Sequence, residues 1–241
     1  TLPAYGYYWF ALAEASALPR WHSPMPEPLP ELITLVIGGD SRSLLAGREV
    51  SYIERHLLKA YLPRQRWFSG KGDRIETIAV EPIARLSGGG MEHLLTYVHV
   101  DLAGGTRQTY ALPLLLNWAS HSQLTPAQRA FSLAKVRRGP RVGTLIDGAT
   151  EEALFAALAD GLRRGESIPT ETGNLVFTPS ALLEKVPLSE AVKVLHIEQS
   201  NASAVVGDAM LLKVYRRIEE GLQPEIEISR FLTEEARVAH A

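Results

Sequence analysis

The 241-residue sequence contains no cysteine. This absence excludes disulfide bonds, thiolate catalysis and cysteine-ligated zinc sites, and it is typical of a protein of the reducing cytoplasm. A strong net charge is missing as well, because 25 Lys and Arg residues face 27 Asp and Glu residues, for a formal charge of −2. Such a balance gives no electrostatic attraction to nucleic acid or to an anionic membrane.

Long apolar runs are also absent. Stretches such as Ala111–Leu116 are far shorter than the ~20 residues that a membrane-spanning helix needs, and Thr1–Ala13 lacks the basic start of a signal peptide. The seven histidines are scattered without metal-binding spacing, and the sequence has no Walker A, GxGxxG or Gly-x-Ser-x-Gly motif. With 46% hydrophobic and 22% charged residues, the chain is typical of a soluble globular protein of one or two domains.

The first thirty residues differ in composition from the rest. Residues 5–12 are dense in aromatic side chains and favour a strand. A strand is not stable alone, so this one either joins a later sheet or closes a domain that precedes it. Five prolines between Pro19 and Pro30 then predict an extended linker, which we place at 14–30.

The next segment predicts a compact α+β unit. Leu32–Ile37 is a short apolar strand, and Gly47–Ala60 has the apolar spacing of a helix. Three antiparallel strands are expected after it, with a hairpin turn at Gly104-Gly105; they are Ile75–Leu86, Leu94–Leu102 and Thr106–Leu116.

The second half adds further strands and two helices. The helix Thr150–Arg164 has Thr150 as its expected cap, and the last helix begins at Pro224, which suits a first helical position. A helical turn is expected at Thr125–Ala130. The expected strands are Phe131–Arg137, Arg141–Asp147, Asn174–Thr178, Ala191–Gln199, Ala204–Val206 and Met210–Tyr215.

The order from Ala191 onward is strand, small polar loop, strand, turn, strand with a lysine, and helix with an early glutamate. Protein-kinase-like enzymes have this layout in their small lobe, where the strand lysine contacts the ATP phosphates and the helix glutamate holds the lysine. The candidate lysine is Lys213, whose face of the strand also carries Leu211 and Tyr215. A lysine among apolar neighbours needs a partner, unless it extends from an exposed face into solvent.

The candidate partner is Glu227, with Glu225 and Glu234 as alternatives. Glu225 and Glu227 also suit the positive end of the helix dipole, which needs no ligand. The loop that would cover the phosphates is Gln199, Ser200, Asn201, Ala202 and Ser203. Its small side chains would let backbone amides approach an anion, although most stretches of this kind are ordinary turns.

Residues Arg64–Gly72 combine two arginines, a lysine and the pair Trp67-Phe68. Such a run could grip a sugar or a phosphate, because aromatic faces stack on sugars and on arginines. The favoured interpretation is structural: the aromatic pair fills a small core and the cations stay in solvent.

Several of these segments resemble bacterial maltokinases. Leu62–Lys71 is similar to the signature near the start of that family. Glu198–Ser203 with Leu211–Arg217 is similar to its phosphate loop and lysine strand, and Pro224–Glu227 is similar to the start of the helix with the pairing glutamate. Ala4–Leu12 resembles the closing strand of trehalose synthase, an isomerase that many bacteria fuse to maltokinase.

The resemblance implies a fold and an activity. Maltokinase transfers the γ-phosphate of ATP to maltose with Mg²⁺ and yields maltose 1-phosphate for α-glucan synthesis. A cystatin-like cap, expected at 31–118, precedes the small lobe of an aminoglycoside-kinase-like fold, expected at 119–241. Residues 1–13 would be the tail of a trehalose synthase domain in cis. Lys213, Glu227 and the loop 199–203 would then bind the nucleotide.

The family's catalytic aspartate and magnesium ligands belong to a C-terminal lobe that this sequence does not include. No catalytic or metal-binding residue is therefore assigned here, and we expect the chain alone to be inactive as a kinase. Two alternatives are a non-catalytic docking or regulatory module for a trehalose synthase, and a carbohydrate-binding module built around Trp67 and Phe68.

Overall fold

The computed structural model describes residues 32–88, 91–119, 123–171, 173–180, 183, 191–195, 200–207 and 210–236. The chain divides into two units, Thr1–Glu31 and Leu32–Ala241, and the description below concerns the second. The expected strand at 5–12 and the linker at 14–30 lie outside the described residues.

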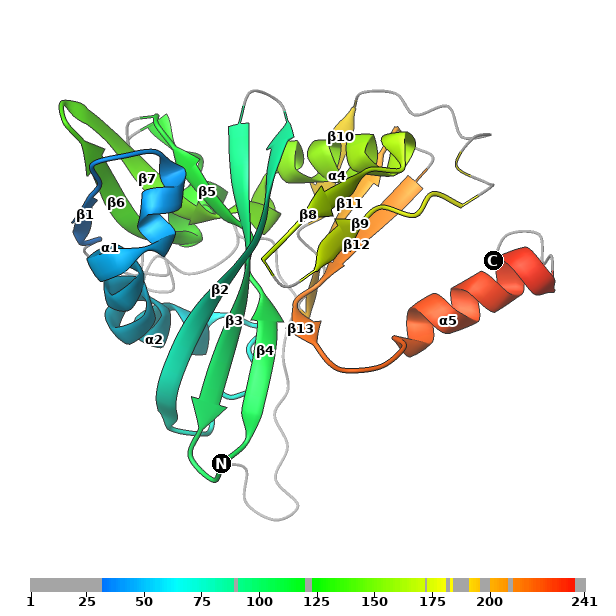
Figure 1. Cartoon of the computed structure of the whole chain (residues 1–241), viewed down its shortest axis with the longest axis horizontal. Helices are drawn as coiled ribbons and strands as arrows, with labels where there is room; N and C mark the ends of the chain where they lie inside the picture. Colours follow the sequence, from blue (N-terminus) through cyan, green and yellow to red (C-terminus); the bar gives the residue numbers. More distant parts are fainter. Residues whose placement is uncertain are drawn as a thin grey trace, which may run out of the picture. The chain divides into compact units, whose positions relative to one another are not determined.

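The main element of the unit is one large sheet (Figure 1). In the described residues it has eight strands in the order β1-β6-β7-β5-β3-β4-β13, and β2 pairs with β3 beside this path. β1 and β6 are parallel, and the other pairs in this sheet are antiparallel. The strands are β1 (Thr34–Val36), β2 (Ile75–Gly88), β3 (Met91–Leu102), β4 (Arg107–Ala111), β5 (Leu114–Asn117), β6 (Ser132–Arg138), β7 (Arg141–Asp147) and β13 (Arg217–Ile218). The mixture of helices with largely antiparallel strands confirms the α+β class.

The long strand β3 is central in the sheet because it pairs with β2, β4 and β5. Its residues alternate between buried and half-buried positions from Thr96 to Leu102. The predicted strand Thr106–Leu116 is divided in two, since β4 ends at Ala111 and β5 begins at Leu114. Pro113 lies in this gap and has no amide hydrogen for a sheet ladder. The division lets β4 pair with one half of β3 while β5 reaches β7.

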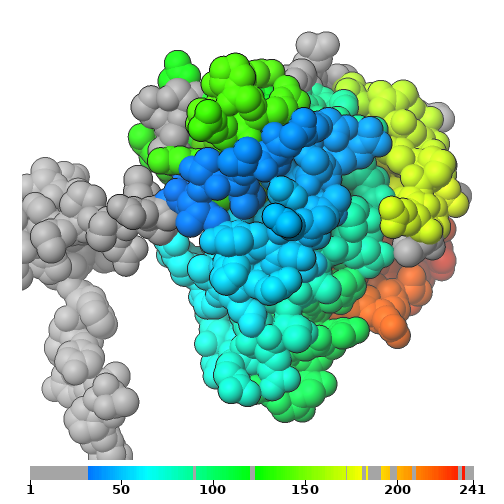
Figure 2. Space-filling model, turned by 60° about the vertical axis from the view of Figure 1, so that its left-hand side comes forward, coloured from blue at the N-terminus to red at the C-terminus, as the bar shows by residue number. Residues whose placement is uncertain are grey.

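A helical segment covers one side of this sheet. It runs without a break through α1 (Gly47–Tyr52), the π-helical turn η4 (Ile53–Leu58), α2 (Lys59–Tyr61) and the 3-10 turn η5 (Leu62–Arg64), and the 3-10 turn η3 (Ser41–Leu45) precedes it. η4 packs on β2 and β6, and Ile53, Leu58 and Leu62 are fully buried there. Figure 2 shows this blue segment spread over the face of the unit that is turned toward the viewer. The predicted helix at 47–60 is confirmed.

Helix α4 (Glu152–Arg164) connects the large sheet with a second, smaller one. It packs against β2 on one side and against β10 and β11 on the other. Residue 161 of α4 is a glycine, and a Cβ added there would lie 2.8 Å from the Phe177 ring. The short hairpin β8 (Ser167–Pro169) and β9 (Asn174–Val176) follows α4.

The start of α4 differs from the prediction. Glu151, rather than Thr150, occupies the cap position. The hydroxyl of Thr150 instead donates to the backbone oxygen of Asp147 at 2.9 Å, because Gly148–Thr150 forms the 3-10 turn η7. The other predicted turn is confirmed as α3 (Pro126–Ala130), which Thr125 and Gln128 close with a capping box.

The smaller sheet holds β10 (Val192–Leu195), β11 (Asn201–Val206) and β12 (Met210–Tyr215), all antiparallel. The chain leaves this sheet at Arg216 and joins the large sheet directly as β13, which pairs with β4. The large sheet also continues through β6 and β7, past the domain boundary that the sequence placed at residue 118. The two predicted parts therefore share one sheet.

The last helix is α5 (Pro224–Arg230), extended by the π-helical turn η9 (Phe231–Glu235). Pro224 stands at its first position as predicted, and the side chain of Gln223 caps it by accepting from the amides of Glu225 and Ile226. No residue of α5 is buried. Figure 1 shows most of the helix lying away from both sheets, and its first turn contacts β12 through Glu225.

Candidate nucleotide-binding site

The candidate site centres on Lys213 in the middle of β12. Lys213 is in register with Ser203 of the neighbouring strand β11, and its side chain is 26% exposed. The ammonium group donates to a carboxylate oxygen of Glu225, and the hydroxyl of Tyr215 donates to the other oxygen at 2.8 Å. Lys213 and Tyr215 are two residues apart, so one face of the strand presents both donors to one carboxylate.

These donors change the acidity of Glu225. The hydrogen bond from Lys213, followed by the one from Tyr215, lowers the pKa of the Glu225 carboxyl group. Hydrogen bonds to the charged form favour that form, so the pair is a cation and an anion at neutral pH. A strand lysine and a helix acid therefore form an ion pair, which is the arrangement that the sequence analysis predicted in outline.

The acid in this pair is not the expected one. The sequence analysis favoured Glu227, and the structure instead pairs Lys213 with Glu225, which was an alternative. The reason is helical geometry: residues two apart lie about 200° apart around a helix axis, so Glu225 and Glu227 point in nearly opposite directions. Whether either acid takes part in nucleotide binding stays a prediction.

The segment that was expected to form the phosphate loop also differs from the prediction. Asn201, Ala202 and Ser203 belong to strand β11 and pair with Tyr215, Val214 and Lys213 of β12. Ser203 is fully buried. A loop conformation for these three residues is therefore wrong, because they follow the sheet ladder instead of forming an open anion cradle. Ser200 forms a bend just before β11, and Gln199 lies outside the described residues.

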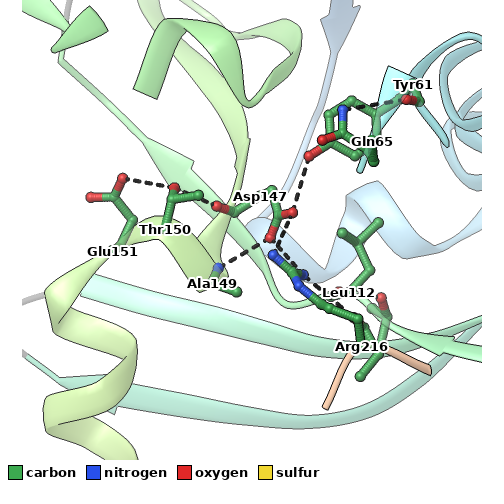
Figure 3. Close-up of polar contacts among 10 residues, drawn as sticks. Tyr61, Gln65, Leu112, Asp147, Ala149, Thr150, Glu151 and Arg216 are labelled. Atoms are coloured by element: carbon green, nitrogen blue, oxygen red, sulfur yellow. Dashed lines mark hydrogen bonds and ion pairs between the residues drawn. The ribbon is translucent and has the colours of Figure 1, made fainter. Parts of the chain in front are cut away.

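Arg216, three positions after Lys213, connects the strand of the candidate site to the large sheet. Arg216 is 3% exposed and forms a two-pronged ion pair with Asp147, which is 0% exposed. The guanidinium group donates to the two carboxylate oxygens at 3.0 and 2.8 Å. Tyr61 donates its hydroxyl to the same carboxylate at 3.0 Å, and the amide of Ala149 donates at 3.1 Å. Figure 3 shows Tyr61 and Arg216 converging on Asp147 from different elements.

We name this cluster the Asp147 anchor (Tyr61, Asp147, Arg216). Its surroundings change the acidity of the Tyr61 hydroxyl. Burial, together with the negative charge of Asp147, raises the pKa of the Tyr61 hydroxyl well above its usual range. Tyr61 therefore stays neutral and donates at physiological pH. The Arg216 guanidinium also lies 5.0 Å from the ring of Trp67, close enough for a cation–π interaction.

Sequence reasoning missed this anchor. Asp147 had been recognised as the end of a strand and Arg216 as part of a similar segment, but 69 residues separate the two. A signal was present, since each of these charged residues borders an apolar strand and therefore requires a partner if it is buried.

The segment Arg64–Gly72 has the structural role that the analysis favoured. Phe68 is 2% exposed, and the rings of Trp67 and Phe68 lie 5.5 and 5.3 Å from the ring of Tyr110 in the core. Arg64, Arg66 and Lys71 are exposed. The aromatic pair therefore fills the core beneath the helical segment, which argues against a sugar-binding platform at Trp67 and Phe68.

In the described residues, no group of three or more His, Asp or Glu side chains could hold a metal ion. None of the helices in this part of the chain is long and apolar enough to span a membrane.

Residues 61–151 match the family model of the maltokinase N-terminal cap domain. The matched segment contains β2–β7 and two of the three anchor residues, Tyr61 and Asp147. It supports a maltokinase-type N-terminal region in this chain. Lys213, Glu225 and Arg216 lie outside the matched segment.

Proposed function

We propose that the chain is the front part of a maltokinase, containing its cap and the strands and helix that hold the ATP phosphates. One observation carries the proposal: downstream of a segment that matches the maltokinase cap, a strand lysine pairs with an acid from the next helix. Protein-kinase-like enzymes use such a pair to place a cation against phosphate oxygens.

The residues present fit this role. The Lys213 side chain is partly exposed, so a phosphate could reach it. The carboxylate of Glu225 fixes the direction of the Lys213 side chain. Because the pKa of Glu225 is lowered, this carboxylate does not take the proton of the lysine. Ser203 of β11 lies directly across the sheet from Lys213.

In the proposed reaction the anomeric oxygen of maltose bonds to the γ-phosphorus of ATP, the bond to the β-phosphate bridging oxygen breaks, and ADP leaves. The proton of the sugar hydroxyl would pass to an aspartate of a catalytic lobe. The same lobe would supply the Mg²⁺ ligands. Lys213 would stabilise negative charge on the phosphates, and Glu225 would position Lys213. The 241-residue chain alone is expected to show no turnover.

The proposal extends to the first residues. The segment 1–13 would be the last strand of a trehalose synthase domain and 14–30 the connection to the kinase. The whole polypeptide would then interconvert maltose and trehalose and phosphorylate maltose in the cytoplasm. Sequencing of the flanking coding region tests this part directly, since the fusion requires an α-amylase-like barrel upstream of residue 1.

The nucleotide role is tested by titrating ATP into the isotope-labelled chain and following backbone amide shifts. We expect weak binding that perturbs β11 and β12, and its loss in Lys213→Ala. The matched control is Lys193→Ala, which removes an exposed lysine from β10 of the same sheet. Glu225→Gln should weaken binding and Glu227→Gln should not.

The same variants are then made in the full-length polypeptide and assayed for ATP-dependent phosphorylation of maltose. A Lys213→Ala enzyme with normal kcat and KM for ATP would refute the assignment. So would a folded 241-residue chain whose β12 amides do not respond to ATP while the full-length enzyme shows no loss on substitution.

A further inference from the structure

Strand β12, which carries Lys213, lies at the edge of the smaller sheet and pairs with β11 in the described residues. None of its six residues is buried, and Leu211 is 52% exposed. The register of a strand is strongly specified only where one of its faces is buried, because a slip by one residue moves every side chain to the opposite face. The packing of β12 itself therefore specifies only weakly which face Lys213 occupies.

The end of β12 that is nearer to Lys213 is fixed to the large sheet. We name Arg216–Ile218 the exit segment, because the chain leaves the smaller sheet there. The amide of Ala111 donates to the backbone oxygen of Arg216 at 2.7 Å, and the next two residues form β13, which pairs with β4. The exit segment begins three residues after Lys213, a distance of about 10 Å along a strand.

The buried side chain of the exit segment is that of Arg216. Its guanidinium makes two hydrogen bonds to Asp147 and lies 5.0 Å from the ring of Trp67. If the chain slipped so that Tyr215 took this position, the Asp147 carboxylate would be buried without a cation, which is strongly unfavourable. The Asp147 anchor therefore opposes a slip of β12 in this direction.

The exposed side chain of Arg217 opposes a slip in the other direction. Its guanidinium donates to the hydroxyl oxygen of Ser69 at 3.3 Å, and this hydroxyl lies 2.8 Å from the hydroxyl of Tyr110. If Arg217 moved into the position of Arg216, it would lose both the contact with Ser69 and its backbone pairing with Tyr110. The two neighbouring arginines together therefore define one register of the exit segment.

We propose that the cap positions Lys213 toward Glu225 by holding the register of β12. The positioning residues are the Asp147 anchor, Trp67 and Ser69. Trp67 and Ser69 belong to the segment 64–72, which then has a task beyond filling the core. The consequence for ATP rests on the proposed function, whereas the position of the lysine side chain does not.

The position of Lys213 is tested without nucleotide in the 241-residue chain. The acidity of Glu225 reports this position, because the hydrogen bond from Lys213 is the main cause of the lowered pKa of that carboxyl group. Carbon NMR of isotope-labelled carboxyl groups follows the pKa, and the cross-strand contact between Ser203 and Lys213 reports the register. In Arg216→Met and Asp147→Asn we expect the pKa of Glu225 to rise toward its ordinary value and the Ser203 contact to weaken.

Substitutions at exposed residues keep the test valid where a buried substitution prevents folding. Arg217→Met removes the donor to Ser69, and Ser69→Ala removes the acceptor, so each should raise the Glu225 pKa by a smaller amount. The matched control is Glu219→Gln, which breaks the ion pair of Arg217 with Glu219 at 2.9 Å and leaves the Ser69 contact in place. A second control, Ile53→Ala, removes buried atoms from η4 and lowers stability alone. Neither control should change the Glu225 pKa.

The consequence for ATP is measured in the full-length polypeptide. A residue that only stabilises the fold would change the amount of active enzyme and neither KM value, whereas a positioning residue should raise KM for ATP and leave KM for maltose unchanged. For Asp147→Asn we expect KM for ATP to rise about tenfold or more, because a small misplacement of a binding group costs up to about a hundredfold. Lys213→Ala should raise the same KM.

The outcomes separate this inference from the proposed function. If Lys213→Ala leaves KM for ATP unchanged, the nucleotide role is wrong, and the Glu225 titration still decides whether the cap positions the lysine. If Lys213→Ala raises this KM and the folded anchor and exit-segment variants do not, the positioning role is overturned. It is also overturned if the Glu225 pKa is unchanged in every folded variant, or if the stability control shifts it equally.

Discussion

The substitution Asp147→Asn probes what holds the two sheets together. Asparagine keeps the shape of the side chain and removes its charge, so Arg216 would remain buried beside a neutral group. Breaking a buried ion pair by removing one charge destabilises a protein by about 3–5 kcal/mol. A unit of this size loses about 2–4 °C of melting temperature per kcal/mol. Thermal unfolding followed by circular dichroism at pH 7 should therefore show a fall of roughly 6–20 °C.

The matched control is Asp101→Asn. Asp101 also binds an arginine through two hydrogen bonds, from Arg107 at 2.7 and 3.0 Å, but its side chain is 33% exposed and that of Arg107 is 68% exposed. Solvent screens this second pair, so its loss should lower the melting temperature far less. Equal shifts for the two substitutions would refute the argument that burial makes the Asp147 anchor important.

A double substitution sharpens the test. Asp147→Leu with Arg216→Met removes both charges and fills a similar volume, and it should recover part of the stability that Asp147→Asn loses. If the double variant is less stable than Asp147→Asn, then the hydrogen bonds of Tyr61 and Ala149 to the carboxylate contribute more than the burial of the unbalanced guanidinium.

Two further predictions concern stability alone. His93 is fully buried and burial lowers its pKa from 6.5 to about 4, so the unfolded chain binds the proton first and stability falls as the pH drops from 6.5 toward 4. Between pH 7 and pH 4.5 this fall amounts to about 2 kcal/mol, and it should be missing in His93→Leu when urea unfolding is compared at these two pH values. Gly161→Ala, which in an exposed helix would stabilise by about 1 kcal/mol, should destabilise here because its Cβ would lie 2.8 Å from Phe177, and a rise in the urea midpoint would contradict that.

The sequence predicted most of the secondary structure because burial leaves a local pattern. The apolar spacing of Gly47–Ala60 and the alternation in Leu94–Leu102 both report one buried face, and both elements formed where they were expected. Pairing across long distances leaves no such pattern. The parallel contact of β1 with β6 joins residues about a hundred positions apart, and nothing in either segment specifies the other.

The sequence indicated that a strand lysine would pair with an acid of the following helix, and it did not indicate which acid. Lys213 stood out because it lies among apolar residues and precedes a helix with acids. The choice between Glu225 and Glu227 depends on which side of α5 faces β12, and the local sequence does not determine this. Ser203 looked like part of a loop because its neighbours are small and polar, but small side chains also fit the buried centre of a narrow sheet.

The path of residues 210–218 through both sheets has a practical consequence for dissecting the protein. A piece beginning after residue 151 would keep β10–β12 but lose β4, the strand on which β13 pairs, and would strip Arg216 of its carboxylate. A piece ending at residue 151 would leave the edge of β4 uncovered and Asp147 without its cation. Neither piece should be stable when produced separately, so truncation series designed to divide cap from kinase will yield aggregates unless both halves are co-expressed.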